Sequence, residues 1–257
     1  MITSGIDIGA KFVKVLILKD DEVLCRVQER TGFDPSAAAK RAFAAALSQT
    51  GLKEEDIESV YATGARRKKA PHVHDSITDV GAAAKGIAYL QPSVRTVIDV
   101  GGEEGRAVKV SAAGKVEDFA INEQCAAGAG SFTEAIARAL EVPLEEFGRL
   151  SLQSSATIPM NAQCAVFAES EVVSLVHAKT PKADIARAVH DAIASRIISM
   201  VRRVGINNDV ALIGGVAFNP GFVDALSRGM ETEVVVVEHP DYVGALGAAL
   251  AARERSK

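Results

Sequence analysis

The segment most informative about the fold is Ile6-Asp7-Ile8-Gly9-Ala10-Lys11, because Ile98-Asp99-Val100-Gly101-Gly102-Glu103 repeats its pattern later in the chain. Each stretch predicts a strand, an Asp-x-Gly turn and a second strand. A further strand and then a helix follow both hairpins: one helix is expected from about Pro35 to Ser48, the other after a Gly128/Gly130 loop. One hairpin-then-helix plan used twice predicts two halves of common design.

The rest of the chain alternates short apolar strands with helices, which predicts α/β layers. The expected elements are an amphipathic helix over Asp184–Val204, strands over Val210–Ile213 and Val234–Val237, a helix opened by Pro220, and a final helix over Tyr242–Glu254. We therefore expect a first half over residues 1–95 and a second half over residues 96–244. The last helix, 245–257, is expected to pack back on the first half.

The composition excludes several classes of protein. Of the 257 residues, 48% are hydrophobic and 24% are charged, and the formal net charge is −4. No apolar run approaches the roughly 18 residues that a membrane span needs, and a negative net charge gives no general attraction to nucleic acid or anionic lipid. The chain passes from Met1 directly into a strand-like segment without the features of a signal peptide. We expect a cytoplasmic protein that binds neither membrane nor nucleic acid.

The two Asp-x-Gly turns have the chemistry of a phosphate site. A tight turn directs backbone N–H groups outward, and glycine removes the Cβ that would block a phosphate. The turn residues assigned to the phosphates are Gly9, Ala10, Gly101 and Gly102. Asp7 and Asp99 would repel phosphate, so their predicted role is to hold Mg²⁺, directly or through water. Such turns also occur in ordinary hairpins, and it is their occurrence as a pair that favours the phosphate interpretation.

A third glycine turn, Gly214-Gly215-Val216-Ala217, follows the strand expected over Val210–Ile213 and would let a flat nucleoside lie against the backbone. A helix cap or a packing turn is the competing interpretation. Near the C-terminus, Gly244–Ala249 is a run of small residues that suits close helix packing. In this order the turns resemble those of the actin, Hsp70 and sugar-kinase superfamily. The resemblance implies an α/β fold of two RNase H-like halves around a nucleotide cleft that binds Mg-ATP.

The three cysteines are Cys25, Cys125 and Cys164, a sparse and odd set that argues against a disulfide framework. By number alone each is expected to be a small buried hydrophobe. However, the stretches Asn122–Phe132 and Cys164–Val172 resemble the two signature stretches of one family: the ATPases that activate 2-hydroxyacyl-CoA dehydratases or serve ATP-dependent benzoyl-CoA reductase. The resemblance implies that Cys125 and Cys164 ligate a 4Fe-4S cluster shared between two chains, and leaves Cys25 in the core. The second chain would be another copy or a paralogous ATPase subunit.

The same resemblance implies a mechanism and further site residues. ATP hydrolysis would gate the transfer of a low-potential electron from a ferredoxin-like donor to a CoA-ester reductase or dehydratase. Gly128, Gly130 and the helix bearing Glu134 would border the nucleoside, with Glu134 near the ribose. Lys11 would approach the phosphates. The attacking water needs an orienting group, for which Glu103 is the first choice and Glu104 the second.

Two features bear on the choice within the family. Dehydratase activators typically carry Gln where this chain has Glu103, and Gly105-Arg106-Ala107 resembles the small ATPase subunit of benzoyl-CoA reductase. These features favour a reductase subunit over a homodimeric dehydratase activator. A small-molecule kinase resembling the N-acetylhexosamine kinases and a regulator with a vestigial nucleotide site are the alternatives from other classes. The basic run Arg66–Lys69 is interpreted as a solvated loop, with docking to an acidic redox partner as the alternative.

Overall fold

The computed structural model describes the chain except residues 72, 123–129, 161–164 and 256–257. The chain forms two compact units. The first unit consists of Met1–Val94, Val110–Glu117 and Asp241–Lys257, and the second of Arg95–Lys109 and Asp118–Pro240. No helix among the described residues is long and apolar enough to cross a membrane.

The first unit contains one five-stranded sheet in the order β3-β2-β1-β4-β5. Its strands are β1 (Ile2–Ile8), β2 (Phe12–Lys19), β3 (Glu22–Arg30), β4 (Ser59–Thr63) and β5 (Asp75–Ser76). Its helices are α1 (Pro35–Thr50), α2 (Asp79–Leu90) and α8 (Val243–Arg255), with short 3₁₀ turns at Glu54–Asp56 and Arg67–Lys69. The helices expected at Pro35–Ser48 and Tyr242–Glu254 are confirmed to within two residues at each end.

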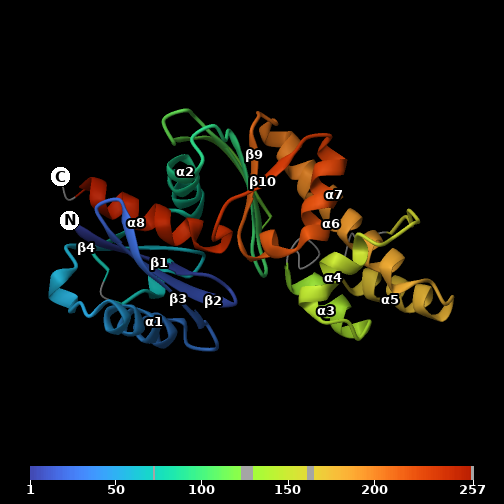
Figure 1. The fold of residues 1–257 in the computed structure, drawn as a ribbon, viewed down its shortest axis with the longest axis horizontal. Coiled ribbons are helices and arrows are strands. Elements are labelled where there is room, and N and C mark those ends of the chain that lie inside the picture. Colours follow the sequence, from blue (N-terminus) through green and yellow to red (C-terminus); the bar gives the residue numbers. More distant parts are fainter. Residues whose placement is uncertain (72, 123–129, 161–164, 256–257) are drawn as a thin grey trace. The chain divides into compact units, whose positions relative to one another are not determined.

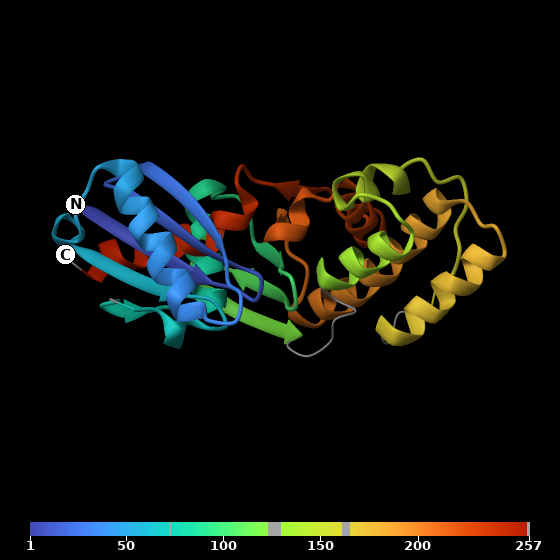
Figure 2. The same ribbon diagram turned by 90° about the horizontal axis from the view of Figure 1, so that it is seen from below.

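Helices cover both faces of this sheet (Figures 1 and 2). The alanine side of α1 packs against the buried face of β1 and β2, which includes Ile6 and Val15. On the other face, α8 packs against Leu16 and Leu18. The approach is so close that a Cβ at Gly5 would collide with the backbone carbonyl of Ala245. The small residues of the last helix therefore serve packing.

The second unit holds the other sheet, in the order β10-β9-β6-β7-β8, apart from the ends of β7 and β8 that adjoin the Val110–Glu117 segment. Its strands are β6 (Thr96–Val100), β7 (Gly105–Val110), β8 (Val116–Asn122), β9 (Val210–Ile213) and β10 (Val234–Val236). Its helices are α3 (Gly130–Ala139), α4 (Leu144–Ser151), α5 (Ala165–His177), α6 (Lys182–Val204) and α7 (Pro220–Met230), and a 3₁₀ turn spans Gly215–Phe218. The long helix, the strand after it and the helix opened by Pro220 are confirmed.

The expected internal repeat is present in the register of the two sheets. In each unit an antiparallel hairpin, β1/β2 or β6/β7, is joined along its first strand by a later parallel strand, β4 or β9. Asp7 lies opposite Lys14 and beside Thr63, and Asp99 lies opposite Arg106 and beside Ile213. The two predicted metal-side aspartates therefore occupy the same position in the two sheets.

Candidate functional site: two glycine corners

The first corner is the turn between β1 and β2. The N–H of Gly9 donates to the carbonyl of Phe12 at 3.0 Å, which closes the turn. Arg66, from the loop after β4, donates through Nη1 to the carbonyls of Gly9 at 3.2 Å and Ala10 at 3.0 Å. Thr31 Oγ1 also donates to Gly9 O at 3.0 Å. The predicted phosphate turn is therefore held rigidly from three segments of the first unit.

The second corner is the turn between β6 and β7, and it has the same construction. The N–H of Gly101 donates to the carbonyl of Glu104 at 2.9 Å. The first residues of α3 are bonded to this turn: Gly130 N–H donates to Gly101 O and Ser131 N–H to Gly102 O, each at 2.9 Å. Three residues predicted separately for the nucleotide site, Gly101, Gly102 and Gly130, therefore lie together.

A glycine after the parallel strand completes each corner. Gly64 has φ +93°, and a Cβ there would lie 2.5 Å from the carbonyl oxygen of Ile8 and 2.6 Å from Asp7 Oδ1. Gly214 has φ +87°, and a Cβ there would collide with the carbonyl of Val100 and lie 2.7 Å from Asp99 Oδ1. Both the left-handed backbone and the close approach require glycine. Sequence reasoning predicted Gly214 but missed Gly64, which the repeat identifies as its counterpart after β4.

The corners differ in charge. Counting from the aspartate, Lys11 in the first corner occupies the position of Glu103 in the second, and Phe12 the position of Glu104. Glu103 is exposed, whereas Lys11 and Glu104 are half-buried. Arg66 adds a second cation to the first corner. The structure thus has one basic corner and one acidic corner on a common backbone plan.

The acidic corner contains a buried arginine. Arg106 donates through Nη1 to Asp99 Oδ2 at 3.0 Å, and its Nη2 contacts the carboxylate of Glu104. The exposed fractions of the three side chains are 11%, 18% and 24%. Sequence analysis considered Arg106 only as part of a family motif; its pairing with Asp99 depends on cross-strand register.

The third glycine turn lies beside the acidic corner within the second unit. Gly214 N–H donates to Pro240 O at 2.9 Å, and the backbone turns into the 3₁₀ segment Gly215–Phe218. A Cβ at Gly130 would lie 3.0 Å from a methyl of Val216, so the predicted nucleoside residues Val216 and Gly130 are neighbours. Glu134 lies half-buried one turn along α3. The roles assigned to these residues remain predictions.

The predicted cluster ligands Cys125 and Cys164, and Gly128, lie outside the described residues. The helices that follow them begin at Gly130 and Ala165. Cys25 is buried at 4% exposure, as expected for a core residue, and burial raises the pKa of its thiol. Among the described residues there is no group of three or more His, Cys, Asp or Glu side chains that could hold a metal ion.

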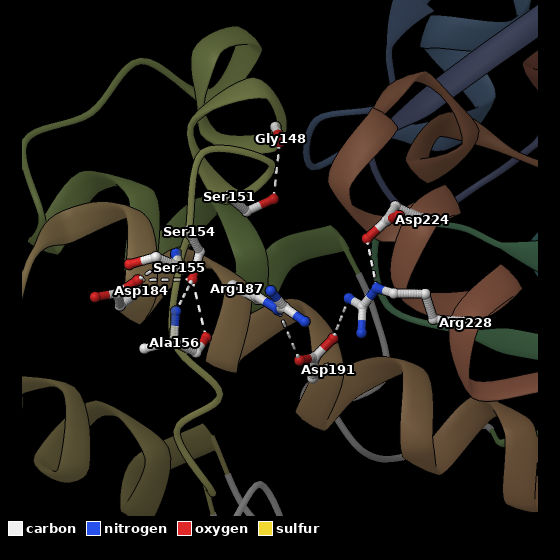
Figure 3. A network of polar contacts seen from close by, with 10 residues as sticks. All are labelled: Gly148, Ser151, Ser154, Ser155, Ala156, Asp184, Arg187, Asp191, Asp224 and Arg228. Carbon is white, nitrogen blue, oxygen red and sulfur yellow. Dashed lines mark hydrogen bonds and ion pairs between the residues drawn. The ribbon is translucent and has the colours of Figure 1, made fainter.

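A polar network fixes the helices of the second unit (Figure 3). In α6, the buried carboxylate of Asp184 accepts from Ser154 Oγ at 2.7 Å and from Ser155 N at 3.2 Å. Farther along the same helix, Asp191 accepts from Arg228 of α7 at 2.6 Å. These contacts tie the loop after α4 and the helix α7 to α6, and therefore support the glycine turn that precedes α7.

The whole chain matches known proteins. A family model described as the BadF/BadG/BcrA/BcrD ATPase family matches residues 4–252. The activator of lactoyl-CoA dehydratase from Anaerotignum propionicum is 40% identical, with 100% of this chain and 99% of the relative covered. A benzoyl-CoA reductase subunit from Thauera aromatica is 35% identical, with 97% of this chain and 92% of the relative covered.

Solved structures agree with this assignment. Component A of the (R)-2-hydroxyglutaryl-CoA dehydratase of Acidaminococcus fermentans superposes with a TM-score of 0.95 at 35% identity, with 100% of this chain and 99% of that chain covered. The activator of 2-hydroxyisocaproyl-CoA dehydratase from Clostridium difficile, with bound ADPNP, superposes with a TM-score of 0.93 at 35% identity. The match covers 100% of this chain and 96% of that chain. A ROK family glucokinase from Streptomyces griseus gives 0.63 at 15% identity, with 99% and 100% covered, which shows the sugar-kinase type of fold alone.

Proposed function

Because the chain belongs to the BadF/BadG/BcrA/BcrD ATPase family, we propose that it is an ATP-hydrolysing component that activates a CoA-ester dehydratase or reductase. The observation that carries the nucleotide site is the duplicated corner, in which an aspartate, a glycine turn and a left-handed glycine recur in both units. A relative of known structure at 35% identity has bound ADPNP, which supports ATP as the ligand.

Both corners are proposed to contact the phosphates, with a lysine beside the phosphate in the basic corner and an aspartate beside it in the acidic corner. In the basic corner, the N–H group of Ala10 and the ammonium of Lys11 bind phosphate oxygens, while Gly9, whose N–H closes the turn, lets the phosphate approach the backbone. In the acidic corner, the N–H group of Gly102 binds phosphate beside Asp99, and Gly101, whose N–H closes the turn, again leaves room for the phosphate. The backbone N–H groups need no side-chain movement to bind, which makes both corners preorganised.

Two observations fit Mg²⁺ beside the aspartates. Gly64 and Gly214 leave clear the space that a Cβ would fill next to the carboxylates of Asp7 and Asp99. Thr63 Oγ1, beside Asp7 in the parallel register, is buried and has no hydrogen-bond partner among the described residues. A water of a hydrated Mg²⁺ would satisfy such an oxygen, since Mg²⁺ retains several waters when bound to one or two carboxylates.

The remaining site residues follow from position. Exposed Glu103 is proposed to orient the attacking water, because the carboxylate of Glu104 is already paired with Arg106. Gly214, Gly215 and Val216 are proposed to contact the base together with Gly128 and Gly130, and Glu134 to contact the ribose. These assignments rest on the neighbouring positions of Gly130 and Val216 and on the family resemblance.

Cys125 and Cys164 are proposed to hold a 4Fe-4S cluster jointly with two cysteines of a second chain. Bound there, the cluster supplies one-electron transfer to the partner enzyme. The helix beginning at Ala165, directly after Cys164, supports this, because the positive end of a helix stabilises a thiolate. A ferredoxin-like protein is the proposed donor.

A 2-hydroxyacyl-CoA dehydratase is the first proposed partner. Three relatives named as dehydratase activators are 40%, 35% and 36% identical along nearly their whole length. The reductase subunit that the sequence favoured is retained second, supported by the Gly105-Arg106-Ala107 motif and by 35% identity to a reductase subunit. In the first case the mate is a second copy of this chain; in the second it is a paralogous subunit. The kinase alternative has only the fold in its favour.

ATP hydrolysis by purified variants tests the nucleotide site. We expect Lys11→Ala to weaken ATP binding by about tenfold and Glu103→Gln to lower kcat by about 100-fold with little change in KM. Lys19→Ala and Glu22→Gln, at the exposed far end of the β2/β3 hairpin, are the matched controls. If the variants and the controls lose ATP binding and hydrolysis equally, or if neither loses them, Lys11 and Glu103 do not belong to the nucleotide site.

The electron-transfer role is tested by anaerobic purification with iron and sulfide analysis. We expect about two iron atoms per chain in the wild type, and loss of the cluster in Cys125→Ser and Cys164→Ser but not in Cys25→Ser. ATP-dependent activation of an added lactoyl-CoA dehydratase or benzoyl-CoA reductase then distinguishes the two partners. Iron-free preparations that still hydrolyse ATP would contradict the redox role and leave the nucleotide site standing.

A further inference from the structure

Arg106 is a buried cation that contacts two carboxylates of the acidic corner. Its residue exposure is 9%. Nη1 donates to Asp99 Oδ2 at 3.0 Å and Nη2 contacts Glu104. Three charges with side-chain exposures of 24% or less interact more strongly than charges in bulk water. The cluster of Arg106, Asp99 and Glu104 is therefore expected to be stronger than the salt bridges of an exposed surface.

The backbone fixes this ion group in place. Arg106 is the direct cross-strand neighbour of Asp99 in the β6/β7 hairpin. Glu104 is held because its carbonyl closes the turn with Gly101 N–H at 2.9 Å. Asp99 Oδ1 lies close to Gly214, 2.7 Å from the position that a Cβ of that residue would take. The three side chains are therefore restrained from both strands and from the turn.

The formal charge of the corner depends on this arginine. The acidic corner carries three acidic residues, Asp99 at the end of β6 and Glu103 and Glu104 in the turn, and Arg106 offsets one of their charges. Without the guanidinium, the corner would attract a divalent cation more strongly and repel a triphosphate more strongly. A lone cation would also have to displace charge-assisted hydrogen bonds to reach Asp99 Oδ2.

We infer that Arg106 is a positioning residue that makes the acidic corner select Mg²⁺ complexed with nucleotide over the free cation. It does so by holding Asp99 and Glu104 in fixed orientations and by offsetting part of their charge. The inference rests on the proposed function, in which Asp99 lies on the metal side of the nucleotide. It adds that the metal specificity of the corner is set by a residue that is not itself a metal ligand.

The test compares binding of Mn²⁺ alone with binding of Mg-ADPNP. Arg106→Met keeps an unbranched apolar stem and removes the charged guanidinium, and we expect Mn²⁺ alone to bind on the order of tenfold tighter while Mg-ADPNP binds on the order of tenfold weaker. The combined variant Arg106→Met/Glu104→Gln restores the formal charge but not the fork, so the affinity for Mn²⁺ alone should return to within about threefold of wild type and the Mg-ADPNP affinity should recover only to that of Arg106→Lys. Arg106→Lys, which keeps the charge but not the fork, should give nearly wild-type affinity for Mn²⁺ alone and weaker Mg-ADPNP binding. Arg41→Met, which removes an exposed arginine on α1 paired with Glu29, should leave both affinities unchanged.

The inference predicts that the affinity for Mn²⁺ alone rises while the affinity for Mg-ADPNP falls. Misfolding would instead weaken binding of both ligands. Circular dichroism and thermal melting report on folding of every variant. If Arg106→Met weakens both ligands or changes neither, the inference is overturned. If the combined variant binds Mg-ADPNP much more weakly than Arg106→Lys does, Arg106 contacts the nucleotide directly and the inference is again wrong. Should the wild type bind no Mg-ADPNP, the proposed function itself fails, which is a distinct outcome.

Discussion

Replacement of His190 should change the pH dependence of stability. His190 lies in α6, where its ring packs edge-on to Phe147 of α4 with centroids 5.2 Å apart. The side-chain oxygen of Asn219 accepts from Phe222 N–H at the start of α7. The Asn219 amide nitrogen therefore faces His190 Nε2, at 2.9 Å, and Nε2 must be the acceptor. A proton added to Nε2 would face a second donor, so the neutral ring fits this position.

Burial, only partly opposed by the charge of Asp224 and reinforced by that of Arg228, lowers the pKa of His190 to about 3. In the unfolded chain the pKa is about 6.5. The unfolded state then binds a proton that the folded state refuses, so the stability contributed by neutral His190 is complete above about pH 6.5 and falls as the pH drops toward 3. Between pH 8 and pH 5 the loss amounts to about 2 kcal/mol.

The assay is urea unfolding at pH 8, 7, 6 and 5, followed by far-ultraviolet circular dichroism because the chain has no tryptophan. His190→Gln keeps a hydrogen-bond acceptor and cannot become charged. At pH 8 it should be less stable than wild type by about 2–3 kcal/mol from lost packing, and at pH 5 the difference should shrink by about 2 kcal/mol. His177→Gln, at the exposed end of α5, should show no such change. If the difference in unfolding free energy between wild type and His190→Gln stays constant with pH, folding does not lower the pKa of His190.

Two further substitutions test the corners. Gly214→Ala should lower the free energy of unfolding by about 3 kcal/mol, from left-handed backbone strain and a collision with the Asp99 carboxylate; Gly205→Ala, at φ +89° with nothing within 4 Å, should cost about 1 kcal/mol. If urea titrations show the same loss of unfolding free energy in Gly214→Ala and Gly205→Ala, small backbone movements relieve the collision at Gly214. Arg66→Ala removes the two bonds to the first corner and should weaken Mg-ADPNP binding about tenfold in calorimetry, whereas exposed Lys68→Ala should not. Unchanged binding in Arg66→Ala would show that the turn keeps its shape without the arginine.

The basic run Arg66–Lys69 shows how structure altered an interpretation. From the sequence it was a solvated loop or a docking surface. In the structure Arg66 donates to the first corner and Arg67 contacts Asp79 at 3.4 Å, while Lys68 and Lys69 are exposed. Of the four consecutive basic residues, the two arginines therefore make contacts within the fold and the two lysines face solvent. Sequence spacing could not separate them, because the carbonyls that Arg66 contacts are more than 50 residues away.

Sequence patterns alone predicted the repeated α/β plan, the two aspartate turns, and the bounds of α1, α6, β9, β10 and α8 to within two residues. These depend on local causes: apolar periodicity, glycine where a turn needs it, and Pro220 at a helix start. The folded chain was needed to see that Gly64 matches Gly214, that Arg66 holds the basic corner, and that Arg106 offsets the charge of the acidic corner. Each of these depends on which strands lie side by side and in what register. The amino-acid sequence specifies which residues are charged, but the distance between two charges is set only when the sheet forms.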